Sequence, residues 1–213
     1  VLFISLIKTL HLYNLQLATF RTIERRSHIV LCFDIIIRMF RDVNKRRQKE
    51  GVVKRAIEYA QIYNVDEETV KLVAIAHDIA KELTEEENKE YIEKYGIELD
   101  EIEKNNKNLL HSKIGAYICK DKYGFTDDMA NAVNYHTTGR DNMTILEKII
   151  YLADATEESR KYIDIDYYVD TVKDNIDKAM CEVSKWVISV LLERNSAVHV
   201  NTVKCYNYYL KSF

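Results

Sequence analysis

Residues 74–83 read AIAHDIAKEL, and they place a histidine and an aspartate side by side within an apolar run. The run begins at Leu72, so the helix predicted here is apolar on most of its sides and should be buried. Asp66 is the predicted N-cap at its start. Burying His77 and Asp78 without partners would be costly. The pair therefore indicates either a hydrogen-bonded core pair or a shared metal ion.

The absence of proline indicates the fold class. The 213 residues include no proline and only five glycines, whereas average usage would give roughly ten prolines. Because proline breaks helix interiors, a chain without it can form long helices. Gly96 and Gly124 are predicted to end helices, and one long helix is predicted over residues 166–195. We predict an all-α helical bundle, with one domain at residues 45–213 and a helical N-terminal extension at residues 1–44.

Composition also limits the partners and the location of the protein. The 31 basic and 34 acidic residues give a net charge of −3, so the overall charge does not call for a polyanionic partner. A basic cluster between residues 38 and 55 could attract nucleic acid or phosphate, but a solvated helix face or inter-helix turn is favoured. Four separated cysteines without a CxxC pair indicate reduced thiols, and no apolar segment reaches the roughly twenty residues of a membrane span. We expect a cytoplasmic protein without membrane or specific nucleic-acid partners.

Three more side chains that can bind metals are predicted to face the core from other helices. His111 lies at the start of one helix. His136 continues an apolar stripe that begins at Met129, and Asp154 shares a face with Leu146. These assignments follow from helix geometry, which brings residues three or four apart onto one face.

Each of these side chains alone has an ordinary explanation. A lone inward histidine is more often hydrogen-bonded to the backbone than bound to a metal, and Asp154 could pair with Arg160. Five such groups on four segments favour a shared cation, because it would satisfy all of them. Imidazoles with carboxylates suit iron, manganese or zinc. Their number favours two metals about 3.5–4 Å apart that activate a hydroxide for phosphate-ester chemistry.

The sequence resembles the bacterial YqeK-type HD-domain hydrolases. Four stretches carry the resemblance in this order: AHDIAKEL, LLHSKIGA, NYHTTGRDNMTILEKIIYLAD and EESR. It runs from about Lys45 to the C-terminus, where HVNTVKCYN also fits. This group cleaves diadenosine tetraphosphate symmetrically into two ADP. The resemblance implies an HD-domain helical bundle and a metal-dependent hydrolase of nucleotide phosphoanhydrides, a symmetrical bis(5'-nucleosyl)-tetraphosphatase.

The resemblance also implies roles for individual residues. The metal ligands would be His77, Asp78, His111, His136 and Asp154. Asp78 would bridge a di-iron centre, with manganese or zinc as alternatives, and Asp78 and Lys81 would be catalytic. The residues around the phosphate chain would be Lys81, Thr137, Thr138, Gly139 and Arg160. Ammonium, guanidinium, hydroxyl and backbone N–H groups suit a bound anion.

The position of the family's first metal ligand departs from the family pattern. Its HS-x-G-V motif supplies the first metal-binding histidine, and the corresponding stretch here is QKEGVV, with Gln48 in place of that histidine. Glutamine offers only a neutral carbonyl oxygen, a poorer ligand than imidazole. We therefore expect weak binding of the ion held with His77 and Asp154. The ion held with His111 and His136 keeps its protein ligands.

Two functions remain open from the sequence. The first is hydrolysis of a dinucleoside polyphosphate, or a phosphohydrolase or phosphodiesterase reaction on another nucleotide. The second is a catalytically impaired HD domain that acts as a nucleotide-binding or interaction module, which Gln48 favours. The expected partner is a nucleotide in both cases, and a homodimer is also considered.

Overall fold

The computed structural model describes residues 43–160 and 164–212, with side chains from residue 50 onward. Over this part of the chain it contains only α-helices and no strand, so the all-α prediction is confirmed. The helices are α3 (Val43–Tyr63), α4 (Glu67–Ala76), α5 (Glu85–Tyr95), α6 (Glu101–Lys104), α7 (Lys107–Tyr123), α8 (Asp127–Asn134), α9 (Ile145–Ala155), α10 (Ile165–Asp174), α11 (Ile176–Glu193) and α12 (Val200–Tyr209). The predicted N-terminal extension, residues 1–44, lies almost wholly outside the described residues.

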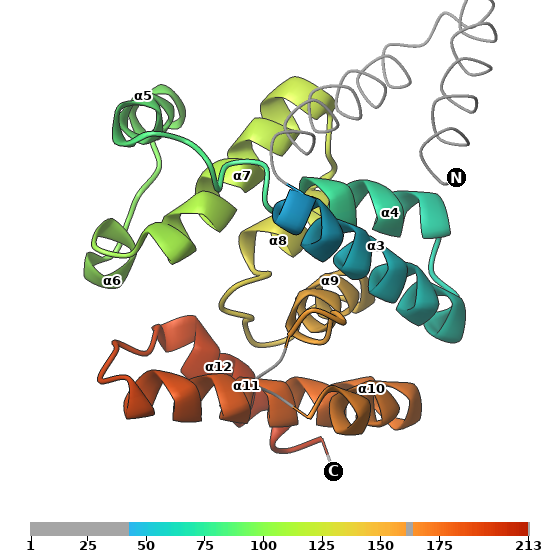
Figure 1. Ribbon diagram of the computed structural model, residues 1–213. Helices are drawn as coiled ribbons and strands as arrows, with labels where there is room; N and C mark the ends of the chain where they lie inside the picture. Colours follow the sequence, from blue (N-terminus) through green and yellow to red (C-terminus); the bar gives the residue numbers. More distant parts are fainter. Residues whose placement is uncertain (1–42, 161–163, 213) are drawn as a thin grey trace, which may run out of the picture.

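The helices form two groups (Figure 1). In the first group, α3 packs against α4 and α9, and α8 packs against α4, α7 and α9. In the second group, α11 packs against both α10 and α12, and it joins the first group through α9. Helices α5 and α6 lie at the edge and pack against α7. The site residues come from the first group, close to the point where α9 meets α11.

Local sequence signals set most helix ends. Asp66 accepts a hydrogen bond from the Thr69 N–H and caps α4, as predicted. Thr84 forms a capping box with Glu87 at the start of α5. Gly96 ends α5 with φ 59°, a left-handed conformation that favours glycine because it has no Cβ.

The single long helix predicted over residues 166–195 is wrong. Two helices occupy this stretch, α10 and α11, and they are separated at Asn175. Asn175 has an extended backbone (φ −156°, ψ 108°) and its side chain accepts from the N–H groups of Asp177 and Lys178. Asparagine readily forms such a cap, so it ends one helix and begins the next.

The helix predicted to carry the His-Asp pair ends earlier than expected. Helix α4 stops at Ala76, and His77 is its C-cap residue. The following residues form successive turns, in which the N–H groups of Ile79 and Lys81 donate to carbonyls three residues back. Likewise, α8 ends at Asn134, so His136 lies in the turn that follows. Two of the candidate ligands are thus held by the ends of helices, where carbonyl groups lack partners within the helix.

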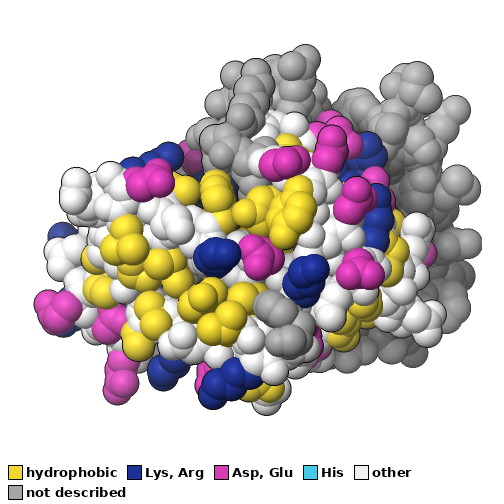
Figure 2. Space-filling view, turned by 90° about the horizontal axis from the view of Figure 1, so that it is seen from below, with side chains coloured by type: hydrophobic (Ala, Val, Ile, Leu, Met, Phe, Trp, Pro, Cys, Tyr) yellow, Lys and Arg dark blue, Asp and Glu magenta, His cyan; other side chains and the backbone are white. Residues whose placement is uncertain are grey.

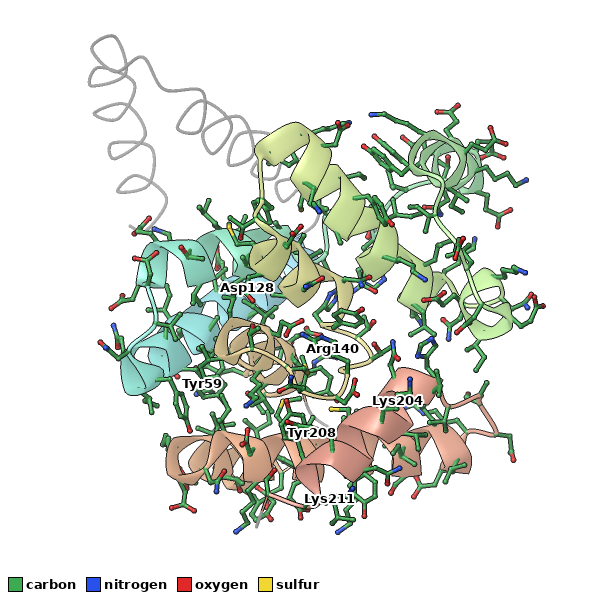
Figure 3. All side chains as sticks on the ribbon, turned by 180° about the vertical axis from the view of Figure 1, so that it is seen from behind. Tyr59, Asp128, Arg140, Lys204, Tyr208 and Lys211 are labelled. Carbon is green, nitrogen blue, oxygen red and sulfur yellow. The ribbon has the colours of Figure 1, made fainter. Side chains whose placement is uncertain are left out.

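Buried polar contacts fix α9 and the turn before it. The Tyr59 hydroxyl lies 2.7 Å from the Thr156 hydroxyl and joins α3 to α9. Arg140 lies among the helices (Figure 3) and donates two hydrogen bonds to the fully buried Glu147, at 2.9 and 2.7 Å. Arg140 also donates to the carbonyls of Asp141 and Asn142. This bidentate pair holds the loop between α8 and α9 in one conformation.

The face formed by α10, α11 and α12 carries apolar side chains among charged ones (Figure 2). The exposed large apolar residues of these helices and of the chain end are Tyr167, Leu192, Val200, Val203, Tyr208 and Leu210. None of the helices in the described part of the chain is both long enough and apolar enough to span a bilayer.

Candidate metal centre

The ends of α4 and α8 orient two histidines in the same way. His77 Nδ1 lies 2.7 Å from the Ala74 carbonyl oxygen, and His136 Nδ1 lies 2.7 Å from the Val133 carbonyl oxygen. A carbonyl can only accept, so each Nδ1 carries the proton. A neutral ring then has its lone pair on Nε2, the nitrogen that faces the centre. Such a backbone contact is the usual means of fixing a metal-binding imidazole.

Three histidine Nε2 atoms surround the Asp78 carboxylate. His111 Nε2 lies 3.0 Å and His136 Nε2 lies 3.6 Å from Asp78 Oδ1. His77 Nε2 lies 3.5 Å from Oδ2. All four residues are at least nine-tenths buried. Asp78 Oδ1 has no hydrogen-bond partner among the described residues, an arrangement that is costly unless a cation is shared there.

His111 reaches this centre from the first half of α7. Its Nε2 lies 3.2 Å from His136 Nε2. Two ring nitrogens facing each other at this distance mean that at least one offers a lone pair. His77, Asp78 and His136 in addition offer ligand atoms that all lie within 4.8 Å of one another. The donor set of imidazole nitrogens and a carboxylate suits a transition-metal ion.

Asp154 stands at the other end of the centre, on α9. His77 Nε2 lies 4.0 Å from Asp154 Oδ1. Arg160 donates to the same oxygen at 2.8 Å and to the Asp154 carbonyl at 3.1 Å. Asp154 thus forms the ion pair with Arg160 that the sequence suggested and also lies near His77; its role as a metal ligand stays a prediction.

The charges of the centre stabilise ionised carboxylates. Burial alone would raise the pKa of Asp78, but the three histidines hold it well below its usual range. Burial also acts to raise the pKa of Asp154, and Arg160 and His77 lower it. The pKa of His136 is lowered by burial, which favours the neutral ring that can bind a metal. These protonation states of Asp78, Asp154 and His136 are the ones required of metal ligands, whereas Asp78 and Asp154 outweigh burial and raise the pKa of His77.

Lys81 lies beside the centre and contacts Asp78. Its Nζ is 2.8 Å from Asp78 Oδ2, and its side chain is 42% exposed. The ammonium therefore balances the carboxylate and still reaches solvent, from where an anionic ligand would approach. Sequence reasoning placed Lys81 on the same helix as His77, whereas it lies in the turns after α4.

A cavity of about 180 Å³ adjoins the centre. Among the predicted site residues, it is lined by His136, Thr137, Asp154 and Arg160. The structure thus brings two candidate metal ligands together with a hydroxyl and a guanidinium group. Lys81 is not among the residues that line this cavity.

Thr138 and Gly139 have local structural contacts. The Thr138 hydroxyl donates to the Gly139 carbonyl at 2.9 Å, and the Gly139 N–H donates to the Tyr135 carbonyl at 2.8 Å. Gly139 has φ 64°, and a Cβ at this position would lie 2.7 Å from Cys205 Sγ. These contacts account for both residues without a ligand; their contact with substrate stays a prediction.

Sequence reasoning missed several residues of the cavity and its surroundings. Tyr151 and Trp186 line the cavity, and Ser112 lies 3.2 Å from the Thr137 hydroxyl. Tyr151 precedes Asp154 by three residues on α9, so helix spacing could have revealed it. Trp186 gave no such signal, because it depends on how α11 packs against α9.

Comparison with known proteins identifies the family. The family model of the HD domain matches residues 49–159, a little over half of the chain. The chain belongs to the HD-domain family. The match begins one residue after Gln48, so the position of the first family histidine lies outside it. The side chain of Gln48 is outside the described residues.

Relatives of this HD domain are known in sequence and in structure. It is 34% identical over 158 residues to a symmetrical bis(5'-nucleosyl)-tetraphosphatase of Halalkalibacterium halodurans, covering 74% of this chain and 84% of the relative. The protein of the same name from Bacillus subtilis is 33% identical over 159 residues, covering 74% and 85%. The predicted relationship is therefore confirmed.

A solved structure shares the fold. The "predicted HD superfamily hydrolase involved in NAD metabolism" from Clostridium acetobutylicum matches with a TM-score of 0.77 and 31% identity. The match covers 84% of this chain and 95% of that one. An HD domain implies a divalent metal, and the unpartnered Asp78 oxygen with its surrounding imidazoles fits that requirement.

Proposed function

We propose that this HD domain is a metal-dependent hydrolase of nucleotide phosphoanhydrides, with symmetrical cleavage of diadenosine tetraphosphate into two ADP as its reaction. The observation that carries the proposal is the buried Asp78 carboxylate, with three imidazole nitrogens directed at it and one oxygen without a described partner. The names and the coverage of the relatives support the substrate class.

The residues that would hold the metal are His77, Asp78, His111, His136 and Asp154. Iron is the proposed metal, and manganese and zinc fit the same donors. When bound, such ions polarise a phosphoryl oxygen and make water a stronger nucleophile. The hydrogen bonds from His77 and His136 to backbone carbonyls keep Nε2 available for this role.

The chain's own cations are proposed to neutralise the phosphate chain. Lys81 would exchange part of its contact with Asp78 for a phosphate oxygen, and Arg160 would offer guanidinium N–H groups beside Asp154. Thr137 would add a hydroxyl from the cavity wall. One water molecule adds across the central phosphoanhydride: its oxygen joins one phosphorus, and the other ADP leaves with the bridging oxygen.

Gln48 favours a second candidate function. A centre that lacks the family's first histidine would hold one of its ions weakly. The chain would then be an impaired HD domain that binds nucleotides without turnover. The intact arrangement of the five remaining candidate ligands favours the enzyme.

Metal analysis under anaerobic conditions, combined with hydrolysis of diadenosine tetraphosphate, tests the two functions. We expect ADP as the sole nucleotide product, and higher metal content and turnover in Gln48→His. Turnover that appears only in Gln48→His would assign the original chain to the impaired function. If neither form binds metal or cleaves the substrate, the proposed function is refuted.

A further inference from the structure

The cavity beside the metal centre has two chemically different walls. His136, Asp154 and Arg160 form a polar wall that belongs to the centre. Tyr151, Trp186 and Val187 also line it, from α9 and α11, together with Thr137 and Ala155. The described volume of about 180 Å³ is below the roughly 300–1,000 Å³ of sites for whole drug-sized ligands. The cavity is therefore suited to one part of a larger ligand.

Trp186 gives the second wall an aromatic surface. It lies on α11, is partly exposed, and neighbours Val187, which packs against the hydrophobic core. An indole ring is a platform for stacking of nucleic-acid bases, because every base has a π-face. Trp186 and Arg160 line the same cavity, so this platform lies near the proposed phosphate site.

Tyr151 lines the same cavity and carries an unsatisfied polar group. The residue is only 3% exposed, and its hydroxyl has no hydrogen-bond partner within the described part of the chain. Burial raises the pKa of Tyr151 well above its ordinary value, so the hydroxyl keeps its proton and can donate. A buried hydroxyl without a partner is costly, and a ligand in the cavity would remove that cost.

We propose that this cavity binds the base of one nucleotide unit of the substrate, with Trp186 stacking on the base and the Tyr151 hydroxyl donating a hydrogen bond to it. The proposal rests on the proposed function, because it assumes a nucleotide whose phosphates lie at the metal centre. It assigns substrate selection to α9 and α11. Neither Tyr151 nor Trp186 was among the site residues expected from the sequence.

A spectroscopic measurement can test this proposal directly. Trp186 is the only tryptophan in the 213 residues, so the intrinsic tryptophan emission of the full chain reports this cavity alone. The metal-loaded protein is titrated with ADP and, separately, with pyrophosphate, which has the phosphates but no base. We expect ADP to quench and shift the emission at saturation, and pyrophosphate to bind without a comparable change.

Matched variants separate stacking from folding. By equilibrium dialysis, Trp186→Ala should weaken ADP binding about tenfold, within the range known for base stacking, and leave pyrophosphate binding within about twofold of the wild type. Trp186→Phe retains an aromatic ring and should stay within about threefold of the wild type for ADP. Tyr151→Phe removes only the hydroxyl and should weaken ADP binding about three- to tenfold.

Three results would overturn the proposal. They are wild-type ADP affinity in Trp186→Ala, an equal loss of ADP and pyrophosphate binding in that variant, and identical emission changes with the two ligands. If hydrolysis of diadenosine tetraphosphate continues in the wild type with any of these results, only the base site is refuted. If the wild type neither binds ADP nor hydrolyses the substrate, the proposed function fails as well.

Discussion

The centre around Asp78 and the cluster of Asp100, Glu103 and His199 both combine imidazole and carboxylate groups, yet the hydrogen bonds of these groups differ. In both, a buried histidine approaches a carboxylate, and in both three residues offer ligand atoms within 4.8 Å of one another. His199 Nε2 lies 2.9 Å from Asp100 Oδ2, slightly closer than the shortest histidine–carboxylate contact at the centre, 3.0 Å between His111 and Asp78. Residue types and distances alone would therefore suggest two metal sites.

Hydrogen bonding distinguishes the two. In the second cluster, Asp100 Oδ1 accepts from the N–H groups of Ile102 and Glu103. Both Glu103 oxygens accept from the Lys113 ammonium, at 2.9 and 2.7 Å. The charges and lone pairs of the carboxylates are thus largely used by the protein itself, whereas Asp78 Oδ1 has no described partner.

The two regions also differ in which ring nitrogen of the histidine carries the proton. His199 Nδ1 accepts from the Asn201 N–H at 3.1 Å, so in the neutral ring the proton lies on Nε2, the nitrogen that faces Asp100. This N–H makes no hydrogen bond among the described residues, but as a donor it cannot bind a cation. At the centre, His77 and His136 use Nδ1 as a donor and direct a lone pair inward. We infer that the second cluster ties α6 to α7 and α12, and that the Asp78 centre is the one built for a cation.

The largest expected effect concerns the histidines at the centre. His136→Ala should lower hydrolysis by more than about 100-fold, beyond the losses typical for partners of metal ligands, because an inward lone pair is removed. Metal content should fall with it, as elemental analysis of the purified variant would show. Unchanged metal content and activity would make His136 an ordinary core histidine.

His199→Ala is expected to lower the stability of the fold and to leave metal binding unchanged. The substitution removes the N-cap of α12 and leaves Asp100 without its imidazole contact, so the free energy of unfolding should fall by about 1–3 kcal/mol. Denaturant titration measures this change. The bound metal per folded chain should equal that of the wild type, and a loss of metal without a loss of stability would reverse the roles of the two regions.

Much of the fold and of the inward-facing residues of the centre could be predicted from the sequence, because caps and helix spacing depend on residues close together in the chain. The cap formed by Asp66 depends only on neighbouring residues, and helix spacing correctly predicted that His111 and His136 face the core. The spacing did not show that α4 ends before His77, because the turns that follow the helix continue its geometry for several residues. It also missed the break at Asn175, whose side chain begins a new helix.

The wall formed by Tyr151 and Trp186 needed the tertiary structure. These residues lie on helices separated by α10, and only the packing of α11 against α9 brings them to one cavity. The contrast between the Asp78 and His199 clusters is also beyond sequence, because it depends on which nitrogen of each ring meets a carbonyl or an N–H group.

Metal content of two matched carboxylate variants tests this contrast most directly. Asp78→Asn and Asp100→Asn each replace a carboxylate by an amide of similar shape, and metal per chain is measured by elemental analysis after anaerobic loading with iron. We predict that Asp78→Asn loses about tenfold or more of the bound metal, while Asp100→Asn keeps the wild-type amount. Wild-type metal content in Asp78→Asn, or loss confined to Asp100→Asn, would contradict the assignment of the metal centre to Asp78.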